Sequence, residues 1–208
     1  MNKLDEKVIK GFGEEWTRFD QSDLDEKELR LISEQYFSIL PWSSLGPNSR
    51  GFDLGCGTGR WARFIAPKVG SLVCIDPSKA IDIAKRNLES HKNIEFLNEN
   101  VFSLSLEENS MDFGYSLGVL HHVTETEAAL RECVKRLKKG SPFLVYLYYS
   151  FENRGLIFKL VWRVSHLVRF AVSRLPSKLK YFVTQLIAFF VYLPFARCSS
   201  FFSAQGFD

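Results

Sequence analysis

Three glycines at every second position, Gly55, Gly57 and Gly59, stand between a short apolar segment and an amphipathic one. Glycine lets the backbone turn sharply and approach a ligand closely, and the first turn of a following helix leaves its N–H groups unpaired. An ordinary tight turn needs only one or two glycines. The spacing therefore indicates a ligand-binding loop that joins a strand to a helix.

Short apolar runs alternate with amphipathic segments over residues 50–149. Such alternation is typical of a parallel sheet with right-handed crossovers and helices on both faces. We therefore expect an open α/β sheet of Rossmann type with five recognisable strands. The expected strands are 50–54, 71–76, 94–97, 112–117 and 142–149, and the expected helices are 22–40, 78–90 and 124–139.

The expected helices carry recognisable N-terminal signals. Ser22 is the expected N-cap of the first helix, and Thr124 with Glu127 forms a capping-box sequence at the third. The third helix is expected to bury one stripe of residues: Leu130, Val134 and Leu137.

Charge divides the chain into unlike parts. Residues 151–208 contain eight Lys and Arg but only two acids, whereas residues 1–150 carry a net charge of −3. We expect a helical lead-in and cofactor lid at 1–49, an α/β core at 50–150, and a basic, apolar helical segment at 151–208 that forms an insertion or cap.

The cysteines and the N-terminal segment bear on compartment. The first residues contain no apolar signal segment, so a cytoplasmic protein is expected. The cysteines are far apart and form no C-x-x-C pair, and no histidine cluster lies near them. Neither a metal site nor a disulfide framework is therefore expected. They are Cys56, Cys74, Cys133 and Cys198.

Residues around the glycine loop narrow the class of ligand. The dinucleotide fingerprint requires a third glycine at position 60, which is Arg60. Asp53, beside the loop, would repel a pyrophosphate but suit a ligand that carries an ammonium and a sulfonium. Asp76, at the end of the next strand, can accept hydrogen bonds from ribose hydroxyls. S-adenosylmethionine is therefore the expected cofactor.

The stretch from Asp53 to His122 resembles the core of the class I S-adenosylmethionine-dependent methyltransferases. DLGCGTGR is similar to the first motif of that family, and the acid of CIDPS to the second. The segment FLNENVFSLSLEENSMDFGYSLGVLHHV runs parallel to the third and fourth motifs and ends in the typical Leu-His-His. The resemblance covers residues 50–149 and implies the fold, the cofactor and methyl transfer.

The same resemblance implies a cofactor site at the ends of the first four strands. The loop would face the methionine part, the acid after the second strand the ribose, and residues after the third strand the adenine. Asn100 stands where the family usually has an aspartate, and its side-chain carbonyl can still accept a hydrogen bond from the adenine amino group. The expected cofactor residues are Asp53, Gly55, Cys56, Gly57, Thr58, Gly59, Asp76, Pro77, Asn100, Val101 and Leu117, with Ser78 and Gly118 beside them.

Candidates for the chemistry follow the fourth and fifth strands. Methyl transfer requires the protein to position an acceptor and, for a hydroxyl or amine, to remove a proton. His121 and His122 are the candidate catalytic residues, with His122 preferred, and packing or helix capping is the alternative for each. Tyr148 and Tyr149 either point into an acceptor pocket or belong to the core.

The two ends of the sequence leave alternatives open. Trp16 and Phe19 either close a lid over the cofactor or attach an N-terminal helix to the sheet. Residues 155–203 are expected to be helical, with one basic face. They form either a cap on the sheet or an interfacial helix pair on an anionic membrane surface, and their uncharged run, 181–196, is too short to span a bilayer.

The family fold normally contains seven strands, whereas only five are recognisable here. The fifth would be an exposed apolar edge, which proteins usually protect. Residues 151–208 cover this edge, or the chain is the N-terminal part of a longer enzyme. The second reading is favoured.

The methyl acceptor stays open from the sequence. A small-molecule, glycan or lipid-linked acceptor is expected, and no nucleic acid. Two alternatives to the methyltransferase are an NAD(P)-dependent Rossmann oxidoreductase and a non-catalytic fragment that binds S-adenosylmethionine.

Overall fold

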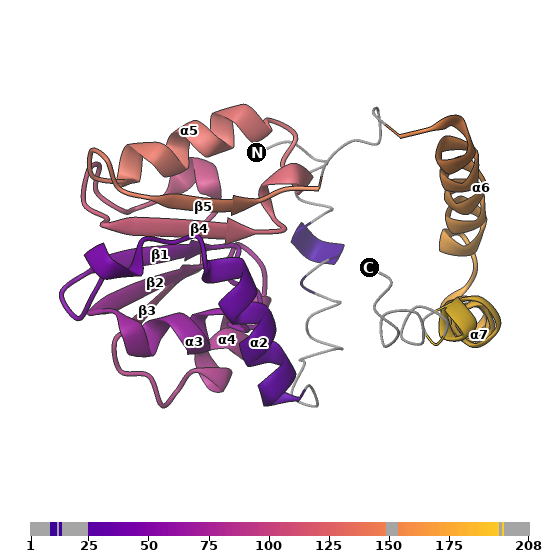
Figure 1. The fold of residues 1–208 in the computed structure, drawn as a ribbon, viewed down its shortest axis with the longest axis horizontal. Coiled ribbons are helices and arrows are strands. Elements are labelled where there is room, and N and C mark those ends of the chain that lie inside the picture. The colour runs from indigo at the N-terminus through magenta and orange to yellow at the C-terminus, as the bar shows by residue number, and fades with distance from the viewer. Residues whose placement is uncertain (1–8, 12, 14–24, 149–153, 196, 198–208) are drawn as a thin grey trace. The chain divides into compact units, whose positions relative to one another are not determined.

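The computed structural model describes residues 9–11, 13, 25–148, 154–195 and 197. The chain divides into two units, Met1–Tyr148 and Tyr149–Asp208. The sheet lies in the first unit, and the second contains helices (Figure 1).

The first unit contains a five-stranded, fully parallel sheet with the order β3-β2-β1-β4-β5. This arrangement confirms the expected Rossmann-like fold. The strand order reverses between β1 and β4, and ligands of such sheets bind at the carboxyl ends of the strands beside this point. The strands are β1 (Arg50–Leu54), β2 (Ser71–Ile75), β3 (Ile94–Leu97), β4 (Phe113–Leu117) and β5 (Phe143–Tyr146).

Helices cover both faces of the sheet (Figure 1). One face is covered by α2 (Glu26–Phe37), α3 (Ala62–Ile65) and α4 (Ala80–Asn87), and the other by α5 (Thr126–Arg136). Alternate residues of β2 show why the strands are apolar throughout. Leu72 and Cys74 pack with the first group of helices, whereas Val73 and Ile75 pack on the α5 side.

The N-terminus of α2 differs from the expectation. Its N-cap is Asp25, whose carboxylate accepts a hydrogen bond of 2.9 Å from the Lys27 N–H. Ser22 lies outside the described residues. Asp25 can serve as the cap because an N-terminal carboxylate satisfies a free N–H and suits the helix dipole.

The predicted capping box of α5 is wrong. The N-cap is Glu125, which makes no side-chain capping bond. The Thr126 hydroxyl donates instead to the Val123 carbonyl over 2.9 Å. Of the expected stripe, Leu137 is buried and Leu130 is partly buried against the core, whereas Val134 is 55% exposed. The helical residues that α5 buries are Ala129 and Cys133.

The second unit contains α6 (Leu156–Ser173) and α7 (Ser177–Ile187), and α7 continues into a π-helical turn, Ala188–Tyr192. The expected helical character of this segment is confirmed for its described part. No side chain of α6 is buried. Among the helices of the described residues, none is both long enough and apolar enough to cross a bilayer.

Candidate functional site

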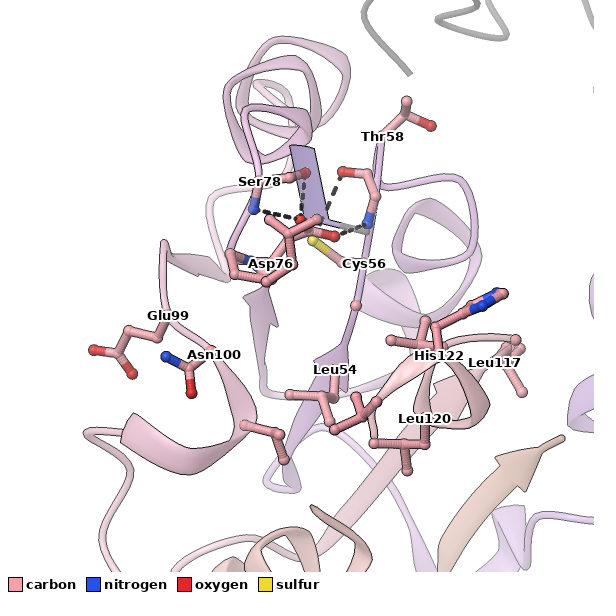
Figure 2. A pocket seen from close by; sticks show the side chains of 18 of the residues that line it. Leu54, Cys56, Thr58, Asp76, Ser78, Glu99, Asn100, Leu117, Leu120 and His122 are labelled. Carbon is pink, nitrogen blue, oxygen red and sulfur yellow. Dashed lines mark hydrogen bonds between the residues drawn. The ribbon is translucent and has the colours of Figure 1, made fainter. Parts of the chain in front are cut away.

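A pocket opens at the carboxyl ends of the strands on both sides of the point where the strand order reverses (Figure 2). Its walls come from the glycine loop after β1 and from the segments that follow β2, β3 and β4. One residue of the N-terminal segment, Ile9, also lines it. The lining residues are Ile9, Leu54, Gly55, Cys56, Gly57, Thr58, Arg60, Trp61, Asp76, Pro77, Ser78, Glu99, Asn100, Val101, Phe102, Leu117, Gly118, Val119, Leu120, His122 and Val123.

The glycine loop serves two separate purposes. Gly57 lines the pocket and has a φ of 54°, in the region that favours glycine. Gly59 has a φ of 80° but does not line the pocket. A Cβ added at Gly59 would come within 2.5 Å of the Leu88 side chain, at the end of α4. The third glycine, predicted at the cofactor, therefore allows the loop to pack against α4.

Asp76, directly after β2, ties the loop to the neighbouring strand. Its Oδ2 accepts a hydrogen bond of 3.0 Å from the Gly57 N–H, and its Oδ1 accepts bonds from the Ser78 N–H (2.9 Å) and hydroxyl (2.6 Å) (Figure 2). A carboxylate offers about four lone pairs. The three protein bonds leave about one acceptor position, which lies on Oδ2.

The segment after β3 forms one side of the pocket, with Glu99 and Asn100 across from His122 (Figure 2). Asn100 caps the short 3₁₀ turn Val101–Ser103, because its side-chain oxygen accepts a bond of 2.9 Å from the Phe102 N–H. One lone pair of that oxygen remains for a ligand donor. Glu99 was missed by sequence reasoning, although it directly precedes Asn100 after an expected strand.

The structure contradicts the predicted role of Asp53. This residue does not line the pocket and is 2% exposed. Because Phe52 and Leu54 point towards the α5 side, the residue between them points to the opposite face, where Asp53 lies beside Tyr115 of β4. Its Oδ2 has no hydrogen-bond partner in the described part of the chain.

Asp53 is also mostly protonated at neutral pH. Burial raises the pKa of Asp53 to about 8; the nearby Tyr115 hydroxyl opposes the rise and the Asp76 carboxylate adds to it. A buried, mostly protonated carboxyl neither repels a pyrophosphate nor attracts a cationic ligand. The charge argument built on Asp53 is therefore wrong, whereas Asp76 occupies the expected wall of the pocket.

The two histidines lie together in the 3₁₀ turn Leu120–His122, with ring centroids 4.0 Å apart. His122 lines the pocket, and His121 does not. Burial lowers the pKa of both imidazoles, and His121 lowers that of His122 further. Both rings are therefore predominantly neutral at pH 7 and able to accept a proton. The His121 ring nitrogens have no hydrogen-bond partner among the described residues.

Four aromatic residues singled out in the sequence have different outcomes. Tyr148 is 65% exposed and lies 4.3 Å from the His121 ring, so its assignment to the core is wrong. Tyr149, Trp16 and Phe19 lie outside the described residues, and their predicted roles stay untested.

Of the other residues predicted at the cofactor, the structure brings all but Gly59 to the pocket. Arg60 and Trp61 were not predicted there. In the sequence, Arg60 served only as evidence against the dinucleotide fingerprint. The predicted residues that meet at the pocket are Gly55, Cys56, Gly57, Thr58, Asp76, Pro77, Ser78, Asn100, Val101, Leu117, Gly118 and His122.

Residues 52–145 match a family model described as a methyltransferase domain. Demethylmenaquinone methyltransferase from Lactococcus lactis is 36% identical over 97 residues, which cover 42% of this chain and 37% of the relative. Phosphoethanolamine N-methyltransferase 2 from Caenorhabditis elegans is 28% identical over 114 residues, which cover 53% of this chain and 26% of the relative.

The crystal structure of the YcgJ protein from Bacillus subtilis is similar with a TM-score of 0.51 at 22% identity, covering 61% of this chain and 52% of that one. This likeness concerns the fold. The chain spans well under half the length of the two curated relatives. Residues 52–145 are therefore similar to the methyltransferase domain of that family model, and the sheet order and the glycine loop agree with this similarity.

Proposed function

We propose that this chain binds S-adenosylmethionine in the pocket and transfers its methyl group to a small-molecule acceptor. The observation that carries the proposal is the Asp76 carboxylate, which holds the Gly57 N–H of the loop and keeps an acceptor position beside it. A loop backbone and a carboxylate on adjacent strands suit a nucleoside whose ribose donates to the acid.

The remaining walls fit the other parts of the cofactor. Asn100 retains a lone pair and two amide N–H donors for the adenine edge, with Val101 beside it. Leu117 and the loop residues are then left for the methionine part. Glu99 has one carboxylate oxygen bonded to the Ser105 N–H over 2.8 Å, and its other oxygen adds an acceptor on the same wall.

The bound cofactor supplies a methyl group on a cationic sulfur, which leaves as a neutral thioether. The chain needs to hold the acceptor in line and take up a proton where the acceptor is a hydroxyl or an amine. His122 lines the pocket as a neutral imidazole and is the proposed base, and His121, 4.0 Å away, packs against it.

The proposed acceptor class is a small molecule, a glycan or a lipid-linked compound. Support comes from relatives whose names give demethylmenaquinone and phosphoethanolamine as methyl acceptors. Neither name decides the acceptor of this chain. A nucleic acid is not proposed.

Isothermal titration calorimetry of the full chain tests the proposal. We expect S-adenosylmethionine and S-adenosylhomocysteine to bind, and NAD⁺ and NADP⁺ not to bind. Binding of a nicotinamide cofactor in place of S-adenosylhomocysteine would support the oxidoreductase alternative. Binding without methyl transfer to any acceptor of the three classes would support the non-catalytic alternative.

Two roles stay open for α6 and α7. A cap remains the preferred prediction, because β5 is an edge strand whose unpaired side needs cover. The alternative is an interfacial helix pair on an anionic membrane, and the cations of α6 support this role. The cations of α6 and its C-terminal end have no acid beside them within 154–195: half-buried Lys159 and exposed Arg163, Arg169 and Arg174.

Co-sedimentation with anionic phospholipid vesicles separates these roles. Salt-sensitive binding that is lost when Arg163, Arg169 and Arg174 become Gln would support the interfacial role and contradict a cap alone. A matched control replaces three exposed cations of the first unit by Gln: Arg86, Lys92 and Lys139. Equal loss in the control would show unspecific charge attraction only.

A further inference from the structure

Arg60 is a half-buried cation at the pocket. It follows the glycine loop, lines the pocket, and lays its guanidinium over the Trp61 ring at 4.3 Å from the centroid. Among the residues that the structure describes, no carboxylate forms an ion pair with it. Burial lowers the pKa of Arg60, although the group stays charged.

Two tyrosines lie near this arginine, and a third packs against both of them. Tyr36 of α2 lies edge-on to Trp61, with centroids 5.5 Å apart, and 5.3 Å from the Tyr146 ring. Tyr146 in turn lies 5.9 Å from Tyr148. Tyr36 and Tyr148 are close enough to Arg60 to interact with its charge. We call Tyr36, Tyr146 and Tyr148 the tyrosine cluster.

Arg60 lines the pocket, whereas the tyrosine cluster lies outside the lining, next to Arg60 and Trp61. Tyr146 ends β5 and pairs with Leu117, a pocket residue at the end of β4. Asp76 and Asn100 follow β2 and β3, on the opposite half of the sheet. The nucleoside is proposed above to occupy the β2–β3 half, and the methionine part to lie between the loop and Leu117. Arg60 and the tyrosine cluster then lie on the β5 side, which is left for the acceptor.

The chemistry of these side chains selects an anion. A guanidinium offers five N–H donors in a planar fork and no acceptor, and each tyrosine hydroxyl can donate one more bond. A half-buried cation without a counter-ion is stabilised when an anion binds and supplies the missing charge. The Trp61 ring, which lines the pocket, favours a ligand with an apolar body beside the anionic oxygens.

We propose that Arg60, together with the tyrosine cluster, binds a carboxylate or phosphate group of the methyl acceptor. The acceptor is thus an anionic small molecule with an apolar or aromatic part. This inference rests on the proposed function, because it assigns the side of the pocket towards β5, beyond the methionine part at Leu117, to the acceptor.

The test uses the full chain saturated with S-adenosylhomocysteine and a pair of probes that differ in charge, 4-hydroxybenzoate and 4-hydroxybenzamide. We expect the benzoate to bind at least tenfold more tightly than the amide, measured by calorimetry and by tryptophan fluorescence. Arg60→Gln should abolish this preference and Arg60→Lys should reduce it. Arg86→Gln, a change of an exposed arginine on α4, should leave it unchanged.

Three results would overturn the inference. The wild-type chain shows no preference for the benzoate, or Arg60→Gln keeps the preference. The third result concerns the cofactor's own carboxylate. Arg60→Gln could weaken the binding of S-adenosylhomocysteine tenfold and leave the binding of 5′-methylthioadenosine, which lacks the amino-acid part, unchanged. Arg60 would then bind the cofactor instead of the acceptor.

Failure of the proposed function itself has a different signature. In that case the wild-type chain does not bind S-adenosylhomocysteine at all, whatever the state of Arg60. Thermal unfolding of each variant, with Arg60→Lys as the conservative change, shows whether a lost preference comes from a lost fold.

Discussion

Removing the Asp76 carboxylate should weaken cofactor binding through two routes that can be measured separately. The first is the loss of an ionised acceptor for the ribose, worth about 1.5–3 kcal/mol, or roughly a 10- to 150-fold loss of affinity. The second is a looser loop, because the Gly57 N–H loses its bond to Oδ2. Asp76→Ala should therefore bind S-adenosylhomocysteine at least tenfold more weakly.

The structure limits the number of hydrogen bonds that the ribose can donate to Asp76. Three of its roughly four acceptor positions are already used by Gly57 and Ser78. One ribose hydroxyl can bond directly to Oδ2, and a second bond requires the Ser78 hydroxyl to turn away from Oδ1. The sequence-based expectation of two simultaneous bonds therefore needs a rearrangement of Ser78.

A double-mutant cycle separates the ribose from the loop. The affinities of S-adenosylhomocysteine and its 2′-deoxy and 3′-deoxy analogues are measured by calorimetry for wild type and Asp76→Ala. At least one of the two analogues should bind the wild type roughly tenfold or more weakly than S-adenosylhomocysteine does, whereas its affinity for the variant should be almost the same. Asp82→Ala, an exposed acid of α4 paired with Lys85, serves as a control of equal charge change. A folded Asp76→Ala chain of unchanged affinity would refute the ribose assignment.

Three further predictions concern neighbouring groups. Between about pH 5 and 7, Asp53 is mostly protonated in the folded chain and ionised in the unfolded chain. Each unit by which the pH rises in this range therefore lowers the free energy of unfolding by about 1.4 kcal/mol. Asp53→Asn should remove that slope in urea titrations at pH 5, 6 and 7, and parallel curves for both proteins would contradict its burial as a neutral acid. Gly57→Val puts a β-branched residue at a φ of 54° and should weaken S-adenosylhomocysteine at least tenfold, so normal binding by the folded variant would show the loop to be misassigned. The His122 imidazole should titrate at lower pH in the folded chain than in the urea-unfolded chain, as followed by NMR, and equal midpoints would contradict its burial.

Those parts of the fold that depend on local pattern could be predicted from the sequence. The bounds of β1 and β3 agree with the expectation, because a short run with apolar residues between turn residues is a local signal for a strand. The end of β5 could not be predicted, since its apolar run continues beyond Tyr146, where pairing with β4 stops. The exposure of Val134 was not predicted either, because the residues of α5 that pack fully into the core are Ala129 and Cys133.

The candidate site shows the same division. Asp76 and the loop were found because residue type and spacing along one βαβ unit suffice to identify them. Asp53 was misassigned because the face on which a strand residue lies depends on the register and packing of the whole sheet. The role of Arg60 depends on Tyr36, which is close to it only in the folded chain.

Because Gly59 packs against Leu88, substitutions at the end of α4, outside the pocket, should change the affinity for the ligand. Leu88 is fully buried and is absent from the pocket lining, yet its side chain occupies the space that a Cβ on the loop would need. A larger residue at position 88 would press on the back of the loop, and a smaller one would leave it unsupported. Substitutions at this helix end are therefore a way to adjust ligand affinity while every residue in the pocket stays the same.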